Sequence, residues 1–152
     1  MNDVSPTAAA NQQIVITRIF DAPRERVFSA WTEPDQVASW FGPEQFDSPR
    51  ERIDIDLRVG GRYELTMIQR EGGAEYPVRY EILELVEPEL LVLRSDPMPE
   101  MGMPDAVITR VELDDLGDRT RMTLTDGPYS EGVQAEAGWK SSFDKLAAVV
   151  AG

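Results

Sequence analysis

Hydrophobic and polar residues alternate along most of this chain, a pattern that predicts β-strands. The alternation from Ile14 to Phe20 predicts a first strand, with apolar residues on both of its faces. A period of two returns from about Gln45 to Asp126 and predicts six further strands separated by turn residues. Consecutive hairpins imply an antiparallel meander, so one sheet of about seven strands is expected.

Helical spacing appears directly after the first strand and again at the end of the chain. Asp21-Ala22-Pro23 is typical of a helix start, and residues 32–35 resemble a capping box that begins a second short helix. The last segment, Ser130 to Val150, predicts a long helix with one apolar stripe. That stripe consists of Trp139, Phe143, Leu146 and Val150, while Asp144 and Lys145 lie off it and are expected to face water.

Three local patterns refine the predicted strands. Residues 53–59 alternate as a half-buried strand, and Gly60-Gly61 is expected to form a two-residue hairpin turn. Ile82 and Leu83 are adjacent, so the inward phase slips there, as at a β-bulge. Asp126-Gly127-Pro128 is interpreted as the turn between the last strand and the final helix.

A sheet of this width predicts a cavity. Seven strands about 4.8 Å apart span about 30 Å, whereas one helix is about 10–12 Å across. Because wide sheets twist and curl, an apolar hollow is expected between the sheet and the last helix. The predicted ligand-contacting residues are Tyr63, Met67, Tyr80, Leu93, Val107, Met122, Trp139, Phe143 and Leu146, with Trp40 and Phe41 at the mouth. The alternative interpretation is that these side chains simply fill the core.

The composition narrows the chemistry. The chain has 152 residues, 41% of them hydrophobic, which is ordinary for one soluble domain. Residues 1–12 are expected to be a disordered leader before a single domain at 13–152. It has neither Cys nor His, which excludes disulfides, thiol catalysis and sites built on His. No catalytic residue, metal site or cofactor is assigned. No segment resembles a membrane span or a signal peptide, and a cytoplasmic location is expected.

The net charge of −13 argues against nucleic acid as a partner, because phosphates are bound by clustered Lys and Arg. The acidic residues concentrate between positions 81 and 118. This segment contains eleven of them and only two basic residues, Arg94 and Arg110. Such a segment is most simply a solvated face that favours solubility. A docking surface for a basic partner is the sharper hypothesis.

Three segments of the chain resemble the activator of heat-shock-protein-90 ATPase homologue family, which belongs to the START-like, or SRPBCC, superfamily. They are TRIFDAPRERVFSAWTEPDQVASWFGP (17–43), DLRVGGRYELTM (56–67) and AGWKSSFDKLAA (137–148). The resemblance covers residues 14–150 and implies an α+β helix-grip fold, in which a curved antiparallel sheet surrounds a long C-terminal helix. Within its motifs, Asp56 and Arg58 are expected to point outward and to pair.

The sequence leaves three functions open. The first is binding of a small apolar or amphipathic molecule in the cavity. The second is an enzyme of the polyketide cyclase-like type, which would use a pocket carboxylate or Tyr63 and Tyr80, with Arg18 as a further candidate if its strand turns that face inward. The third is a co-chaperone-like protein-interaction module, suggested by the family name. A homodimer is left open as well.

Overall fold

The structure is a computed structural model that describes residues 12–97, 99, 105–129 and 135–151. The described chain forms an eight-stranded antiparallel sheet and three α-helices. The elements are β1 (Gln12–Phe20), α2 (Arg24–Thr32), α3 (Pro34–Trp40), β2 (Phe46–Asp47), the 3-10 turn η1 (Arg50–Arg52), β3 (Asp54–Ile55), β4 (Arg62–Gln69), β5 (Glu75–Val86), β6 (Leu90–Ser95), β7 (Val107–Asp115), β8 (Thr120–Tyr129) and α4 (Ala135–Ala151).

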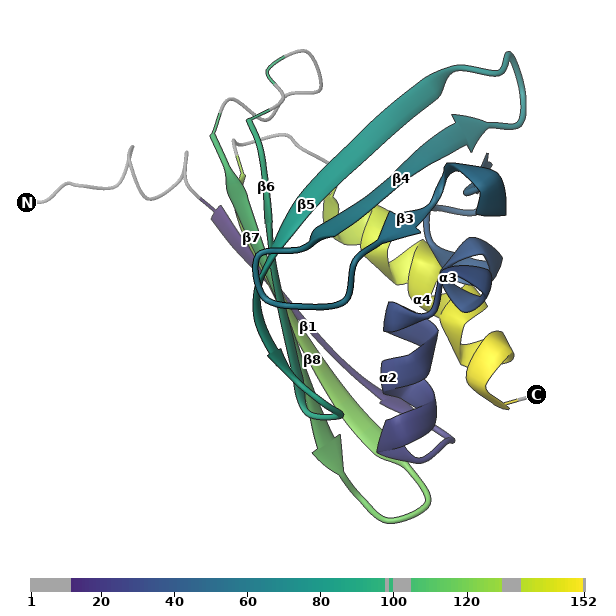
Figure 1. The fold of residues 1–152 in the computed structure, drawn as a ribbon. Coiled ribbons are helices and arrows are strands. Elements are labelled where there is room, and N and C mark those ends of the chain that lie inside the picture. The colour runs from purple at the N-terminus through teal and green to yellow at the C-terminus, as the bar shows by residue number, and fades with distance from the viewer. Residues whose placement is uncertain (1–11, 98, 100–104, 130–134, 152) are drawn as a thin grey trace, which may run out of the picture.

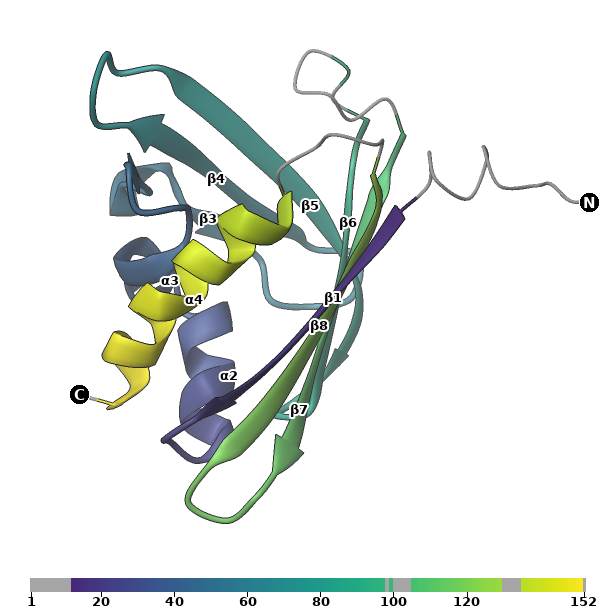
Figure 2. The same cartoon turned by 180° about the vertical axis from the view of Figure 1, so that it is seen from behind.

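The sheet has the strand order β1-β8-β7-β6-β5-β4-β2, with β3 also pairing with β4. It curves, and all three helices lie on its concave side (Figure 1). The reverse view shows α4 running across that side, with α2 and α3 beside it (Figure 2). The predicted α+β helix-grip fold, with two short helices after the first strand and a closing helix, is confirmed.

The core lies between the concave side and the helices. The stripe predicted on the last helix is largely buried, with Phe143 and Leu146 fully inaccessible and Val150 2% exposed. Arg26 of α2 donates from Nε to the carbonyl of Val150 at 2.6 Å and so caps the end of α4. The predicted slip on β5 is also confirmed, because the pairing of β5 with β6 shifts register between Ile82 and Glu84.

The strand predicted at residues 53–59 is wrong beyond β3. Leu57 and Val59 are 42% and 63% exposed, and they lie in a loop rather than in the sheet. The backbone N–H of Gly60 donates to the carbonyl of Ile82, so this loop runs beside β5 and does not form a two-residue hairpin. A Cβ on Gly61 would lie 2.0 Å from the Asp56 carbonyl oxygen, which is why glycine is required there.

Two expectations near the N-terminus are corrected. The outer face of β1 is not covered by the described residues, because Val15 is 60% and Ile19 50% exposed. The capping box is also absent: the hydroxyl of Thr32 donates back to the carbonyl of Phe28 at 2.9 Å. Glu33 takes the cap position of α3 without a side-chain hydrogen bond.

The turn predicted at Asp126-Gly127-Pro128 is wrong, because strand β8 continues through these residues and ends at Tyr129. The leader at residues 1–11 and the predicted first turn of the last helix, at 130–134, lie outside the described residues. Within the described chain, no helix is both long enough and apolar enough to cross a membrane.

Candidate functional site

One part of the interior is an aromatic cluster, formed by Trp31, Trp40, Phe41 and Phe143. The rings of Trp31 and Trp40 lie 4.7 Å apart between centroids, edge to face, and Trp40 lies 5.4 Å from Phe41. None of the four side chains is more than 5% exposed. Trp40 and Phe41 were predicted at the mouth of a cavity, and this is wrong, because both pack in the core.

The polar groups of the aromatic cluster are satisfied internally. The Trp40 indole donates to the carbonyl of Ala30 at 2.8 Å, and the Trp31 indole donates to the sulfur of Met122 at 3.4 Å. The Tyr63 hydroxyl donates to the carbonyl of Trp31. Burial raises the pKa of Tyr63 well above its usual value. Tyr63 is therefore a structural hydrogen-bond donor, and its proton is not available for chemistry.

A different group of side chains surrounds Asp126, which is completely buried. Thr109 donates to Asp126 Oδ1 at 2.6 Å, and the indole N–H of Trp139 donates to Oδ2 at 2.7 Å. The Tyr129 hydroxyl donates to Oδ2 at 2.5 Å. Together with Tyr80, whose pKa is raised by burial and by the nearby Asp126 charge, these residues form what we call the Asp126 cluster. Its three aromatic members are only half-buried.

Four elements bring the Asp126 cluster together. Thr109 on β7 lies directly opposite Asp126 on β8 in the antiparallel register, and Tyr129 follows on the same strand. Tyr80 comes from β5, and Trp139 from α4. The Trp139 ring also lies 5.5 Å from Phe143 and 5.6 Å from Phe41. Trp139 therefore joins the Asp126 cluster to the aromatic cluster.

Burial controls the protonation of the Asp126 cluster. It raises the pKa of the Asp126 carboxyl, although the hydrogen bonds from Thr109, Tyr129 and Trp139 oppose this rise. The pKa values of Tyr80 and Tyr129 are raised too, chiefly by burial and then by the nearby Asp126 charge. Both tyrosines are therefore neutral hydroxyls at ordinary pH. Buried acids with displaced pKa values are typical of functional sites, and also of structural networks.

The predicted ligand-contacting residues divide into two sets. Most of them are buried and pack in the core: Trp40, Phe41, Tyr63, Leu93, Val107, Met122, Phe143 and Leu146. Three keep part of their surface accessible: Met67, Tyr80 and Trp139. The sulfur of Met67 lies against Gly42, where an added Cβ would be 3.2 Å away. The accessible set therefore lies next to the Asp126 cluster and the end of α3.

Asp126 itself was missed at the level of sequence, because Asp-Gly-Pro is a strong turn signal. The alternation of β8 contained the contrary evidence. Thr120, Met122, Leu124 and Asp126 share one phase, and all four are buried. Extending that phase by one more step would have predicted a buried Asp126 carboxylate.

The expected outward pair is confirmed, since Arg58 Nε lies 2.7 Å from an Asp56 carboxylate oxygen. Lys145 was expected to face water, which is wrong. Its ammonium donates to the carbonyls of Pro43 and Phe46 at 3.3 and 3.4 Å. Arg18 turns toward α4, as the candidate role required, but its guanidinium pairs with Asp144 at 2.8 Å.

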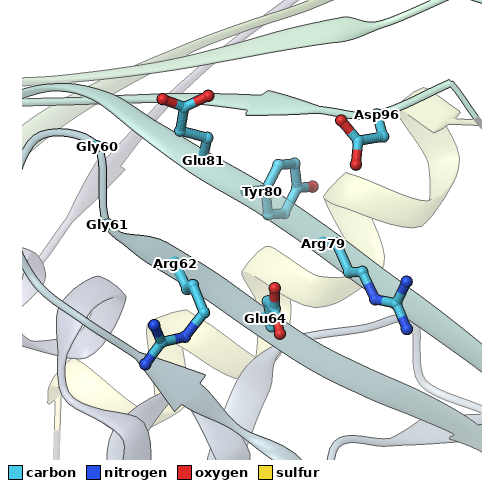
Figure 3. Close-up of a pocket in the computed structure, with 8 residues that line it drawn as sticks. All are labelled: Gly60, Gly61, Arg62, Glu64, Arg79, Tyr80, Glu81 and Asp96. Atoms are coloured by element: carbon cyan, nitrogen blue, oxygen red, sulfur yellow. The ribbon is translucent and has the colours of Figure 1, made fainter.

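The convex side of the sheet carries an open depression of about 220 Å³ between the start of β4 and the middle of β5 (Figure 3). Its charged side chains are Arg62, Glu64, Arg79, Glu81 and Asp96. Both signs of charge are present, and Arg62 is already paired with Asp54 at 2.9 Å. This surface is solvated and shows no preference for one sign of ligand.

The described residues contain no group of three or more acidic side chains arranged to hold a metal ion. In the acidic region at 81–118, Arg110 lies 3.5 Å from Glu112 and 4.0 Å from Glu84, so part of that charge is neutralised locally. No described feature in this region distinguishes a docking surface from a solvated face.

Comparison with known proteins places these features in a family. The family model described as Activator of Hsp90 ATPase homolog 1-like protein matches residues 21–151. A crystal structure of a Chromobacterium violaceum protein is 28% identical, covers 91% of this chain and 96% of its own, and superposes with a TM-score of 0.81. CalU16 from Micromonospora echinospora is 25% identical over 92% of this chain and 76% of its own, with a TM-score of 0.68.

A solution structure of an AHSA1-like protein from Aeromonas hydrophila has the same fold, with 23% identity, 92% coverage of both chains and a TM-score of 0.75. No curated protein sequence matches this chain. The comparisons therefore identify a family and a fold but bring no described activity with them.

Proposed function

Because this chain belongs to the family of Activator of Hsp90 ATPase homolog 1-like proteins, we propose that it binds a small amphipathic molecule between the concave side of the sheet and α4. The polar part of the molecule lies toward the Asp126 cluster. Its apolar part contacts the accessible surfaces of Met67 and Trp139 and the aromatic residues behind them. The helix-grip fold is compatible with this role because its sheet is wider than its closing helix.

The observation that carries this proposal is the buried carboxylate of Asp126. A charged or polar group in an apolar interior costs free energy even when it is hydrogen bonded. Three donors from two strands and a helix converge on it, yet the aromatic side chains around it remain half-buried rather than sealed. A polar network beside accessible aromatic surface is the usual composition of a small-molecule site.

Probe binding tests this function. The chain is titrated with the neutral apolar fluorophore N-phenyl-1-naphthylamine, followed by competition with decanol. We expect saturable binding of about one probe per chain and displacement by decanol. Trp139→Ala is expected to weaken probe binding at least tenfold, because it removes the ring that joins the two clusters.

Leu57→Ser is the matched control, because Leu57 is an exposed apolar side chain outside the site. This variant is expected to bind the probe as the parent does. Thermal unfolding verifies that each variant is folded. Probe binding that does not saturate, or that Trp139→Ala leaves unchanged, would contradict the proposal.

Acid–base catalysis is the second candidate, and one observation favours it. The raised pKa of Asp126 and the two neighbouring tyrosines resemble the protonation pattern of a general acid–base site. Complete burial argues against it, since Asp126 has no surface on which a substrate proton could be placed. A screen for cyclisation and hydrolysis, repeated with Tyr80→Phe and Tyr129→Phe combined, separates the two functions. Catalysis requires an activity that this double variant loses.

A further inference from the structure

We infer that the ligand of the Asp126 cluster is an organic cation, namely a protonated amine with an apolar body. This inference rests on the proposed function and specifies the chemistry of its polar end. Its starting point is the charge of the cluster. Asp126 has no salt-bridge partner among the described residues, and every side chain that donates to it is neutral.

Neutral hydrogen bonds orient a carboxylate but do not cancel its charge. In an interior of low dielectric constant, a missing counter-charge costs more than it does in water. The charged residues that flank Trp139 on α4, Glu136 and Lys140, are exposed and pair with each other at 2.9 Å. The opposing position on β1 is Ile14, which is apolar. The described residues therefore do not balance the charge of the Asp126 carboxylate, and a positively charged ligand would.

Two cations that contact α4 or belong to it are already engaged by other partners. Arg18 pairs with Asp144 of α4, and Lys145 donates to two main-chain carbonyls. Neither contacts the Asp126 cluster. A ligand carboxylate, such as that of a fatty acid, would consequently meet another carboxylate there and find no described cation to compensate it. Anionic ligands are disfavoured on this ground.

The rings around Asp126 suit a cation. Tyr80, Tyr129 and Trp139 are half-buried, so parts of their surfaces remain accessible. The faces of aromatic rings attract ammonium groups, and desolvation strengthens the attraction. Asp126 lies behind these rings and is itself inaccessible. The ammonium group would lie on the rings, with the carboxylate as a counter-ion one layer deeper, and would not need to contact the carboxylate directly.

A series of ligands with one ten-carbon chain tests the inference. Decylamine, decanol and decanoate compete for N-phenyl-1-naphthylamine at pH 7.5 and fixed ionic strength, below their aggregation concentrations. We expect decylamine to bind at least tenfold more tightly than decanol, and decanoate to bind most weakly. In Asp126→Asn, the preference for decylamine over decanol should fall to within threefold, while decanol still binds.

Asp118→Asn is the matched control. It removes one negative charge from the exposed turn between β7 and β8, so it changes the net charge of the protein by the same amount. Its preference for decylamine should equal that of the parent. If both variants reduce the preference equally, the attraction comes from the overall negative charge, and the inference is wrong.

The parent protein supplies a measurement that does not depend on the folding of a variant. Its preference for decylamine over decanol should decrease as pH falls and Asp126 becomes protonated, whereas Tyr80 and Tyr129 stay neutral throughout. A preference that is absent, reversed toward decanoate or insensitive to both pH and Asp126→Asn would overturn the inference. Decanol binding without a preference for the amine refutes this inference alone. No binding of any of the three ligands refutes the proposed function too.

Discussion

The two clusters inside this protein both contain aromatic side chains, but they differ in packing and in hydrogen bonding. The aromatic cluster is closed: the centroids of its contacting rings lie 4.7–6.3 Å apart, and its indole N–H groups donate to acceptors within the protein. The Asp126 cluster also contains aromatic residues, but they surround a carboxylate and keep accessible surface. Both lie under α4, and Trp139 belongs to the contacts of each. In the aromatic cluster, the hydrogen-bond donors reach main-chain and sulfur acceptors. In the Asp126 cluster, they converge on one carboxylate.

This difference suggests a division of labour. In the aromatic cluster, burial of large rings supplies stability, and each polar atom is matched to a main-chain or sulfur acceptor. In the Asp126 cluster, the hydrogen bonds converge on one group whose charge is left unbalanced by the described residues. We therefore expect changes in the first cluster to lower stability, and changes in the second to alter binding and the response to pH.

The largest effect is expected for Trp31→Ala. The side chain of Trp31 is completely buried and contacts Trp40, Trp139 and Phe143. Removing it should lower the free energy of unfolding by about 3–5 kcal/mol, because it leaves a large cavity. Denaturant unfolding measures this loss. Leu57→Ala, on an exposed loop, is the control and should change the same quantity by less than about 0.5 kcal/mol. A small loss in Trp31→Ala would show that the aromatic cluster is not closely packed.

The next effect separates Tyr63 from Tyr80, the two tyrosines that the sequence offered as pocket candidates. Tyr63→Phe leaves the buried carbonyl of Trp31 without its donor and should cost about 1–3 kcal/mol of unfolding free energy. Tyr80→Phe should cost less than about 1 kcal/mol, because Thr109 still donates to Asp126. Urea unfolding of both variants gives the comparison. Equal losses would mean that Tyr80 is as structural as Tyr63.

A pH effect is expected from Asp126→Asn. Since burial raises the pKa of Asp126, the folded protein holds a proton that the unfolded chain, with its ordinary pKa of about 3.9, has already released. The parent should therefore lose stability relative to Asp126→Asn as pH rises from about 3.9 to the raised value, and then show no further change.

The slope of this loss is at most about 1.4 kcal/mol per pH unit, the limit for one proton. Thermal unfolding of both proteins between pH 3.5 and 8 measures it. Tyr80→Phe, which keeps the carboxylate, is the control and should follow the parent. A gain of stability with rising pH would show that the three hydrogen bonds outweigh burial and depress the pKa.

The smallest effect is expected outside both clusters. Arg58→Ala breaks the exposed pair with Asp56 and should lower the free energy of unfolding by less than about 1 kcal/mol, decreasing further with added salt. Probe binding should stay unchanged. Denaturant unfolding at low and high salt provides the measurement. A loss comparable to that of Tyr63→Phe would mean that the conformation of the loop at residues 56–61 depends on this pair.

Much of the fold could be predicted because it depends on local periodicity. The stripe on α4 and the β5 bulge were both visible in the spacing of apolar residues. The failures occurred where tertiary contacts compete with local signals. Residues 53–59 alternate like a strand, but the chain beyond β3 turns away into a loop whose glycines bond to β5. The Thr32 hydroxyl donates to the carbonyl of Phe28 and does not cap α3.

The sequence by itself determined the order of the helices and the long strands, the inward-facing side of β4, β7 and β8, and the absence of thiol and imidazole chemistry. These properties follow from residue types and from periods of 2 and 3.6, which need no knowledge of distant neighbours. The tertiary structure decided which buried residues are closely packed and which buried carboxyl group receives hydrogen bonds from neutral donors alone. Asp126 receives its hydrogen bonds from residues 13 and 17 positions away as well as from a near neighbour. Contacts at that separation exist only after the sheet has paired and α4 has closed over it.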